Sequence, residues 1–163
     1  MEHDELAQKR EEATRIINKN IVWCVGIGFI PFPLLDMVAL TGIQVKMLAE
    51  LAELYEVSFN EQSGKSAVGA LIGGLAPGVM TRGMVGSAMK SVPLFGTLAG
   101  MVTMPVLAGA TTYAVGRVFE QHFASGGTFL TFDPEKVREH YERMFEEGKK
   151  KALDVRNRKK KSK

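Results

Sequence analysis

The sequence contains little cysteine and few large aromatic residues. It has one cysteine, Cys24, one tryptophan and three tyrosines among 163 residues. A single thiol cannot form a disulfide within the chain, which excludes a small disulfide-stabilised scaffold. The first 15 residues are charged and lack the short basic region and apolar stretch of a signal peptide. We therefore expect the chain to begin in the cytoplasm.

Charged residues are missing from long stretches of the chain. Asp36 is the only charged residue in residues 21–45, and Arg82 is the only one in residues 66–89. The 26 residues from 91 to 116 carry no charge at all. Because a helix that crosses a bilayer needs about 20 mainly apolar residues, residues 91–116 are long enough to span one and residues 66–89 are marginal.

The spacing of apolar residues predicts an all-α fold of about five helices arranged as hairpins. Pro31 and Pro33 disfavour a helix interior, so we expect a break at residues 30–33. Asp133 followed by Pro134 is typical of a helix start. The expected helices cover residues 2–20, 33–56, 66–89, 91–116 and 133–155. We divide the chain into a helical domain at residues 1–130, an amphipathic C-terminal helix at 131–155 and a basic disordered tail at 156–163.

Ten of the 17 glycines lie in residues 66–116, many of them four residues apart. On a helix this spacing places them on one face, where a second backbone can approach closely, as in membrane helix pairs. In water each interior glycine costs about 1 kcal/mol relative to alanine. We therefore predict a central, membrane-embedded hairpin whose helix-packing residues are Gly69, Gly73, Gly74, Gly78, Gly96 and Gly100. A soluble bundle around the same hairpin is the alternative.

Asp36 and Arg82 are the candidate functional charges, because each is isolated within an apolar stretch. A carboxylate inside a membrane is a functional candidate by default. Asp36 also lies in the first turn after Pro33, where the helix dipole stabilises a negative charge, and this simpler reading is favoured. A third possibility is that Asp36 pairs with Arg82 or Arg117.

The basic residues are concentrated at the C-terminus. Residues 1–130 carry 9 basic and 11 acidic side chains, whereas residues 131–163 carry 12 basic and 7 acidic ones. Lysines and arginines near an anionic bilayer each contribute about 1 kcal/mol to binding. No aromatic residues interleave the final basic stretch, which argues against nucleic acid. We expect anionic lipid head groups to contact Lys149, Lys150, Lys151, Arg156, Arg158, Lys159, Lys160 and Lys161.

Catalytic and cofactor motifs are not found in the sequence. The Gly64–Ser66 tripeptide resembles the end of a phosphate-binding loop, but Phe59 occupies the position of the required first glycine. The three histidines are scattered, without the spacing of a metal site. We therefore expect a protein without catalytic residues, cofactor or metal.

Residues 30–56 contain a specific pattern, an Ile-Pro-Phe-Pro turn followed by an acidic residue and an apolar helix. In this pattern, and in the glycine-rich residues 66–116, the chain resembles the YcjF-like family of bacterial membrane-associated proteins, which occur beside or fused to Era-like GTPase domains. The resemblance covers about residues 10–125. It implies a helical membrane-associated domain, a GTPase encoded elsewhere as a candidate partner, and no catalytic residues. The matching residues after the turn are Asp36, Gln44, Lys46, Met47, Leu51, Ala52 and Tyr55.

Together these features predict a non-enzymatic helical scaffold or adaptor that forms homo-oligomers through its glycine faces. We expect it at the cytoplasmic membrane of a prokaryote, with the basic tail in the cytoplasm. Two alternatives remain open. The glycine-rich hairpins could form an oligomeric pore lined by Asp36 or Arg82, or the chain could be a soluble helical interaction module.

Overall fold

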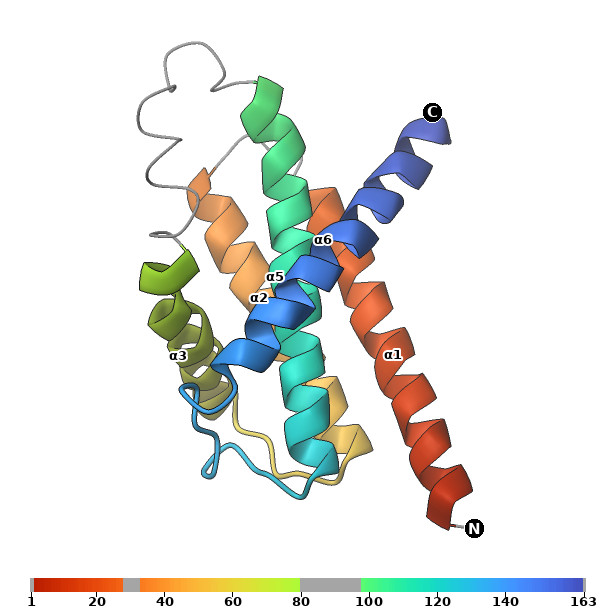
Figure 1. Ribbon diagram of the computed structural model, residues 1–163, viewed down its shortest axis with the longest axis vertical. Helices are drawn as coiled ribbons and strands as arrows, with labels where there is room; N and C mark the ends of the chain where they lie inside the picture. Colours follow the sequence, from red (N-terminus) through yellow and green to blue (C-terminus); the bar gives the residue numbers. More distant parts are fainter. Residues whose placement is uncertain (1, 28–32, 80–97, 163) are drawn as a thin grey trace.

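Figure 1 shows a computed structural model of the chain, which describes residues 2–27, 33–79 and 98–162. At residues 2–3, 27, 33–37, 73–79 and 98–104 it describes the backbone but not the side chains. The regular structure in these ranges consists of α1 (Glu2–Ile27), α2 (Pro33–Leu54), α3 (Glu61–Val79), α5 (Leu98–Ala124) and α6 (Arg138–Lys161). The all-α fold expected from the sequence is confirmed.

Helices α1, α2 and α5 pack together as a bundle, and α6 crosses α5 obliquely while also touching α1 (Figure 1). Helix α3 packs on α2 at the side of this bundle. Helices α1 and α5 run antiparallel, because Gly116 lies against Ile17 whereas Gly109 lies against Val25. The end of α1, the start of α2 and the start of α5 therefore lie together at one end of the bundle, uppermost in Figure 1.

The hydrophobic core lies where α1, α2 and α5 face one another. Buried side chains recur along α1 every three or four residues, which is the period of a helix with one apolar face. The core residues of these three helices include Ala13, Ile17, Ile21, Val25, Val45, Leu48, Leu51, Val106, Tyr113, Val118 and Phe119. Their burial fixes which faces of the three helices meet.

Helices α2 and α5 end in the same hydrogen-bonded motif. After α5, Gly126 adopts a left-handed conformation with φ of 82°, and the N–H of Gly127 donates to the carbonyl of His122 at 2.9 Å. After α2, Glu56 adopts this conformation with φ of 58°, although left-handed backbone favours glycine. The N–H of Val57 donates to the carbonyl of Ala52 at 2.8 Å, which closes the motif.

Helix α3 begins at Glu61, five residues before the expected start at residue 66. The side-chain oxygen of Asn60 accepts hydrogen bonds from the N–H groups of Gln62 and Ser63, at 2.9 and 3.3 Å. Asn60 is thus a helix cap that the sequence analysis missed, although asparagine is a preferred capping residue. The Gly64–Ser66 tripeptide consequently lies inside the first two turns of a helix, which removes its likeness to a phosphate-binding loop.

Helix α6 differs from the expectation at both of its ends. Its start at Arg138 lies beyond Asp133, whose Oδ1 instead accepts a hydrogen bond from the N–H of Glu135 within a turn. The ring of Phe132 stacks on that of Phe119, with centroids 4.4 Å apart, so this turn is held by packing against α5. At its other end α6 continues to Lys161, whereas disorder was expected from residue 156.

The central hairpin lies only partly within the described residues. Helix α5 begins at Leu98 and continues to Ala124, past the expected end at residue 116, and contains Pro105 in its interior. Residues 80–97, which contain Arg82 and the expected junction of the two hairpin helices, lie outside the described residues. In the part of the chain that the structure describes, no helix combines the length and the apolar composition that crossing a bilayer requires.

Candidate functional site

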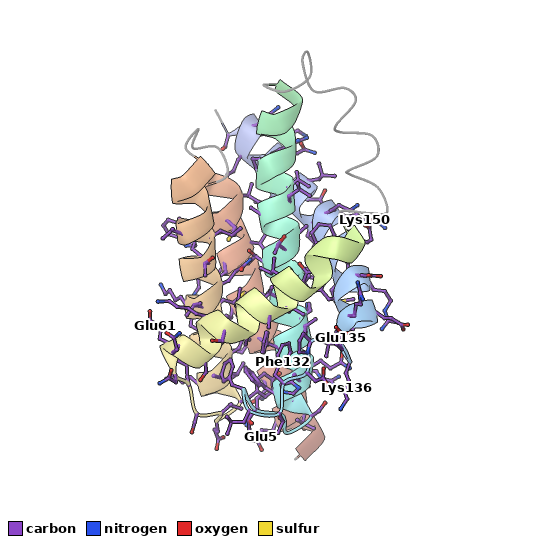
Figure 2. The ribbon with its side chains drawn as sticks, turned by 90° about the vertical axis from the view of Figure 1, so that its left-hand side faces the viewer. Glu5, Glu61, Phe132, Glu135, Lys136 and Lys150 are labelled. Atoms are coloured by element: carbon purple, nitrogen blue, oxygen red, sulfur yellow. The ribbon has the colours of Figure 1, made fainter. Side chains whose placement is uncertain are left out.

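Charge is segregated along the axis of the bundle. The end formed by residues 21–27, 33–43 and 98–112, called here the apolar end, contains one charged residue, Asp36. Figure 2 shows Glu5, Glu61, Glu135 and Lys136 towards the opposite end, whereas Lys150 on α6 lies nearer the apolar end. The antiparallel packing of α1 and α5 is what brings these uncharged segments together.

Large apolar side chains are exposed at the apolar end. Trp23 is 64% exposed and Val38 is 75% exposed, and Val22 is exposed beside Trp23. Single exposed apolar residues are common on protein surfaces, but here a tryptophan and two valines are exposed on segments that carry one charge. Exposed side chains of this kind are suited to contact with another apolar phase.

Residues 149–161 of α6 form a basic arm beside the apolar end. Lys159 Nζ donates a hydrogen bond to the carbonyl oxygen of Val22 at 3.1 Å, which joins the arm to α1. A Cβ atom on Gly26 would lie 2.9 Å from this Nζ, so the glycine leaves space for the lysine. The side chains of the arm that are exposed to solvent include Lys150, Arg158, Lys160 and Lys161.

The arm is held against the bundle by close backbone contacts. A Cβ atom on Gly148 would lie 2.8 Å from the carbonyl oxygen of Ala110 and 2.9 Å from its Cα. A Cβ atom on Gly109 would lie 2.8 Å from Cβ of Ala152. These glycines therefore allow α5 and α6 to approach more closely than larger residues would, and they fix the direction of the basic arm.

Close packing at glycines was predicted, but the described contacts use different glycines. Gly109 and Gly116 lie seven residues apart on α5, a two-turn spacing that differs from the four-residue spacing on which the prediction rested. Gly148 has no glycine neighbour at a helical spacing, so no sequence pattern marks it. A Cβ atom on Gly69 would meet nothing within 4 Å, so Gly69 is not a packing contact within the described chain.

The remaining predicted glycines are not tested by these contacts. Gly73, Gly74 and Gly78 belong to α3 and Gly100 belongs to α5, but the surroundings of these residues are outside the description. Gly96 lies outside the described residues altogether. Packing of these glycines against another helix or another copy of the chain stays a prediction.

The two candidate charges are likewise only partly placed. Asp36 lies in the first turn of α2, at the helix end where a negative charge is favoured, but its side chain is not described. Arg82 lies outside the described residues. The possible pairing of Asp36 with Arg82 therefore stays untested, and Arg117, the other possible partner, forms an ion pair with Glu120.

A buried chain of polar groups crosses the bundle at the inner boundary of the apolar end. Gln44 Nε2 donates to Thr112 Oγ1 at 3.3 Å, and Thr112 Oγ1 donates to Cys24 Sγ at 3.0 Å. Burial raises the pKa of Cys24 to about 11, so the thiol stays neutral at physiological pH. The three residues link α2, α5 and α1 at one level. From the sequence, Cys24 was expected only to form no disulfide within the chain, and this link was not predicted.

Comparison with known proteins agrees with the resemblance in residues 30–56. The chain matches the family described as a domain of unknown function, DUF697, over residues 1–150. It is 37% identical over 147 residues to Magnetosome membrane protein 22 of Magnetospirillum gryphiswaldense, covering 90% of this chain and 75% of that protein. No solved structure matches the chain. The resemblance to YcjF-like proteins is confirmed, and the chain belongs to the DUF697 family.

Proposed function

We propose that this protein is a non-enzymatic, membrane-associated helical scaffold or adaptor that places its apolar end against a bilayer. The segregation of charge along the bundle axis is the observation that supports this proposal. The α1, α2 and α5 segments of this end carry one charge and expose a tryptophan. They are poorly matched to water and well matched to the interfacial layer of a membrane, where tryptophan is enriched.

The basic arm supplies an electrostatic contribution beside the apolar one. Its exposed lysines and arginines lie at the same end of the molecule as Trp23, so both would meet one membrane surface together. Each basic side chain near an anionic surface contributes about 1 kcal/mol, and burial of a side chain such as Val38 contributes roughly 1.5–3 kcal/mol. The bilayer bound by this surface is therefore one with anionic head groups.

The relative named Magnetosome membrane protein 22 supports a membrane location through its printed name. We place this chain at the cytoplasmic membrane of a prokaryote, with the basic arm on the cytoplasmic side, because positive residues favour that side. Self-assembly through the glycine faces is part of the same proposal. The open surroundings of Gly69 on α3 leave room for a second copy there. A GTPase remains the candidate partner that the family resemblance implies.

Trp23 allows a direct experiment because it is the only tryptophan in the chain. The purified protein is mixed with vesicles that contain or lack anionic lipid, and binding is followed by flotation and by Trp23 fluorescence. We expect flotation with anionic vesicles and a blue shift of the emission, with quenching by brominated acyl chains. Absence of flotation with anionic vesicles at low salt would refute the proposal.

A matched pair of variants distinguishes the effect of a charge at the apolar end from the effect of the same charge at an exposed apolar residue elsewhere. Val38→Asp introduces a charge at the apolar end and should weaken vesicle binding. Leu130→Asp introduces the same charge at a side chain that is 96% exposed in the loop between α5 and α6, at the opposite end. It should leave binding unchanged. Equal losses in both variants would show that the apolar end is not the membrane contact.

A further inference from the structure

A polar groove of about 480 Å³ lies in the charged half of the bundle, between α1, α5 and the start of α6. This volume is within the range of small-molecule sites in proteins. The groove is separated from the apolar end by much of the length of α1 and α5. It is lined by Arg10, Thr14, Arg117, Glu120, Gln121, Ala124, Ser125, His140 and Met144.

The charges of the groove are not balanced. Arg117 forms an ion pair with Glu120, which is largely buried, and its guanidinium also lies over the ring of Tyr113 at 5.3 Å from the centroid. Arg10 faces the groove from α1 and has no ion pair with any residue that the structure describes. The pairing of Arg117 with Glu120 therefore leaves the positive charge of Arg10 available to a ligand.

His140 contributes an unsatisfied nitrogen to the same groove. Its Nε2 is buried and has no hydrogen-bond partner among the described residues. Burial lowers the pKa of His140, and Arg143 on the same helix lowers it further, against the opposing effects of the Arg117 backbone and Glu120. The neutral ring thus keeps a buried polar atom unpaired, which is costly unless a ligand supplies the partner.

We propose that this groove binds a small organic molecule bearing an oxyanion, either a carboxylate or a phosphate. Arg10 supplies the charge-assisted hydrogen bond, and His140 becomes protonated as the anion binds, so that Nε2 donates to it. The groove is larger than one oxyanion, and Met144 and Ala124 offer apolar contact to the rest of the molecule. Binding should strengthen as pH falls through the pKa of His140.

The test is a titration of the purified full chain with inorganic phosphate, glycerol phosphate and succinate, without lipid and at constant ionic strength. We expect saturable changes in the His140 ring signals by NMR, assigned by their loss in His140→Gln. The pKa of His140 should rise when the ligand is bound. The phosphate and carboxylate titrations show which oxyanion the groove takes.

Two arginines of α1 provide the matched variants. Arg10→Gln should weaken binding about tenfold or more, the effect of losing one charge-assisted hydrogen bond. Arg15→Gln should bind as the wild type does, because Arg15 pairs with Glu11 at 2.7 Å and does not line the groove. The absence of a saturable response to all three probes would overturn the proposal, and so would equal losses in the two variants.

Discussion

Lys159 and Val22 are 137 residues apart in the sequence, and the side chain of the first donates a hydrogen bond to the backbone of the second. This contact places the end of α6 beside the end of α1. It also explains why α6 continues to Lys161, since a helix docked on another helix is stabilised by tertiary contacts that a free basic tail lacks. The basic arm is therefore a directed feature of the fold.

The contribution of the arm to membrane binding can be measured by neutralising two of its exposed lysines. Lys160→Gln/Lys161→Gln should weaken binding to anionic vesicles roughly 30-fold at low salt, at about 1 kcal/mol for each charge. Lys65→Gln/Lys136→Gln changes the net charge equally but away from the arm, and should have little effect. The difference between the two should shrink at high salt. Similar losses in both would indicate that net charge alone determines binding.

The contact between α5 and α6 should tolerate no side chain at Gly148. Gly148→Ala places a methyl group against the backbone of Ala110, so the helices must separate, and we expect a loss of about 1–3 kcal/mol in the free energy of unfolding. Gly69→Ala is the control, because a Cβ atom at this position would meet nothing within 4 Å. Alanine is favoured over glycine in an exposed helix by about 1 kcal/mol, so this variant should not lose stability. Urea unfolding measures both. A stable Gly148→Ala protein would argue against the close approach of α5 and α6.

Replacement of Glu56 with glycine should stabilise the protein. Left-handed backbone costs a residue with a side chain roughly 1–2 kcal/mol, and Glu56→Gly relieves this cost at the end of α2. The variant also loses the ion pair with Lys9, which is exposed and contributes little. We expect an increase of about 1 kcal/mol in the free energy of unfolding. Gly126→Ala, at the corresponding position after α5, should lose a similar amount.

The raised pKa of Cys24 predicts a loss of stability in alkaline solution. An unfolded thiol ionises near its ordinary pKa of 9.0, whereas the folded thiol stays protonated until about pH 11. The unfolded state therefore binds fewer protons in this window, and the free energy of unfolding should fall as pH rises from 9 to 11. The difference of about 2 between the folded and unfolded pKa corresponds to a loss of about 3 kcal/mol in the free energy of unfolding. In Cys24→Ala this part of the pH dependence should disappear, which comparing unfolding at pH 8 and pH 10.5 would check.

The sequence predicted most helices because their signals are local. Pro33 marks the start of α2, and the apolar period of α1 follows its buried face. The start of α6 was wrong because Asp133 and Pro134 are typical of a helix start, yet the stacking of Phe132 on Phe119 holds that segment as a turn. Such a contact joins distant residues and leaves no local signal.

The candidate sites were predictable to different degrees. The uncharged stretches are visible in the sequence, but their meeting at one end of the bundle depends on the antiparallel packing of α1 and α5. The basic residues of the arm were named from the sequence as candidates for contact with lipid. Their position on a helix that docks beside Val22 was not predicted. The polar groove could not be predicted, because Arg10 and His140 lie on different helices far apart in the chain.

Helix α5 packs against three other helices, whereas α3 packs chiefly on α2. Among the described side chains of α3, opening would uncover mainly Ala67, Val68 and Leu71, whereas opening of α5 would disrupt its interfaces with α1, α2 and α6. Backbone amides of α3 should therefore exchange with deuterium well before those of α5. Helix α3, which carries most of the glycines predicted to pack against another helix, is thus the one that can leave the bundle at the lowest cost.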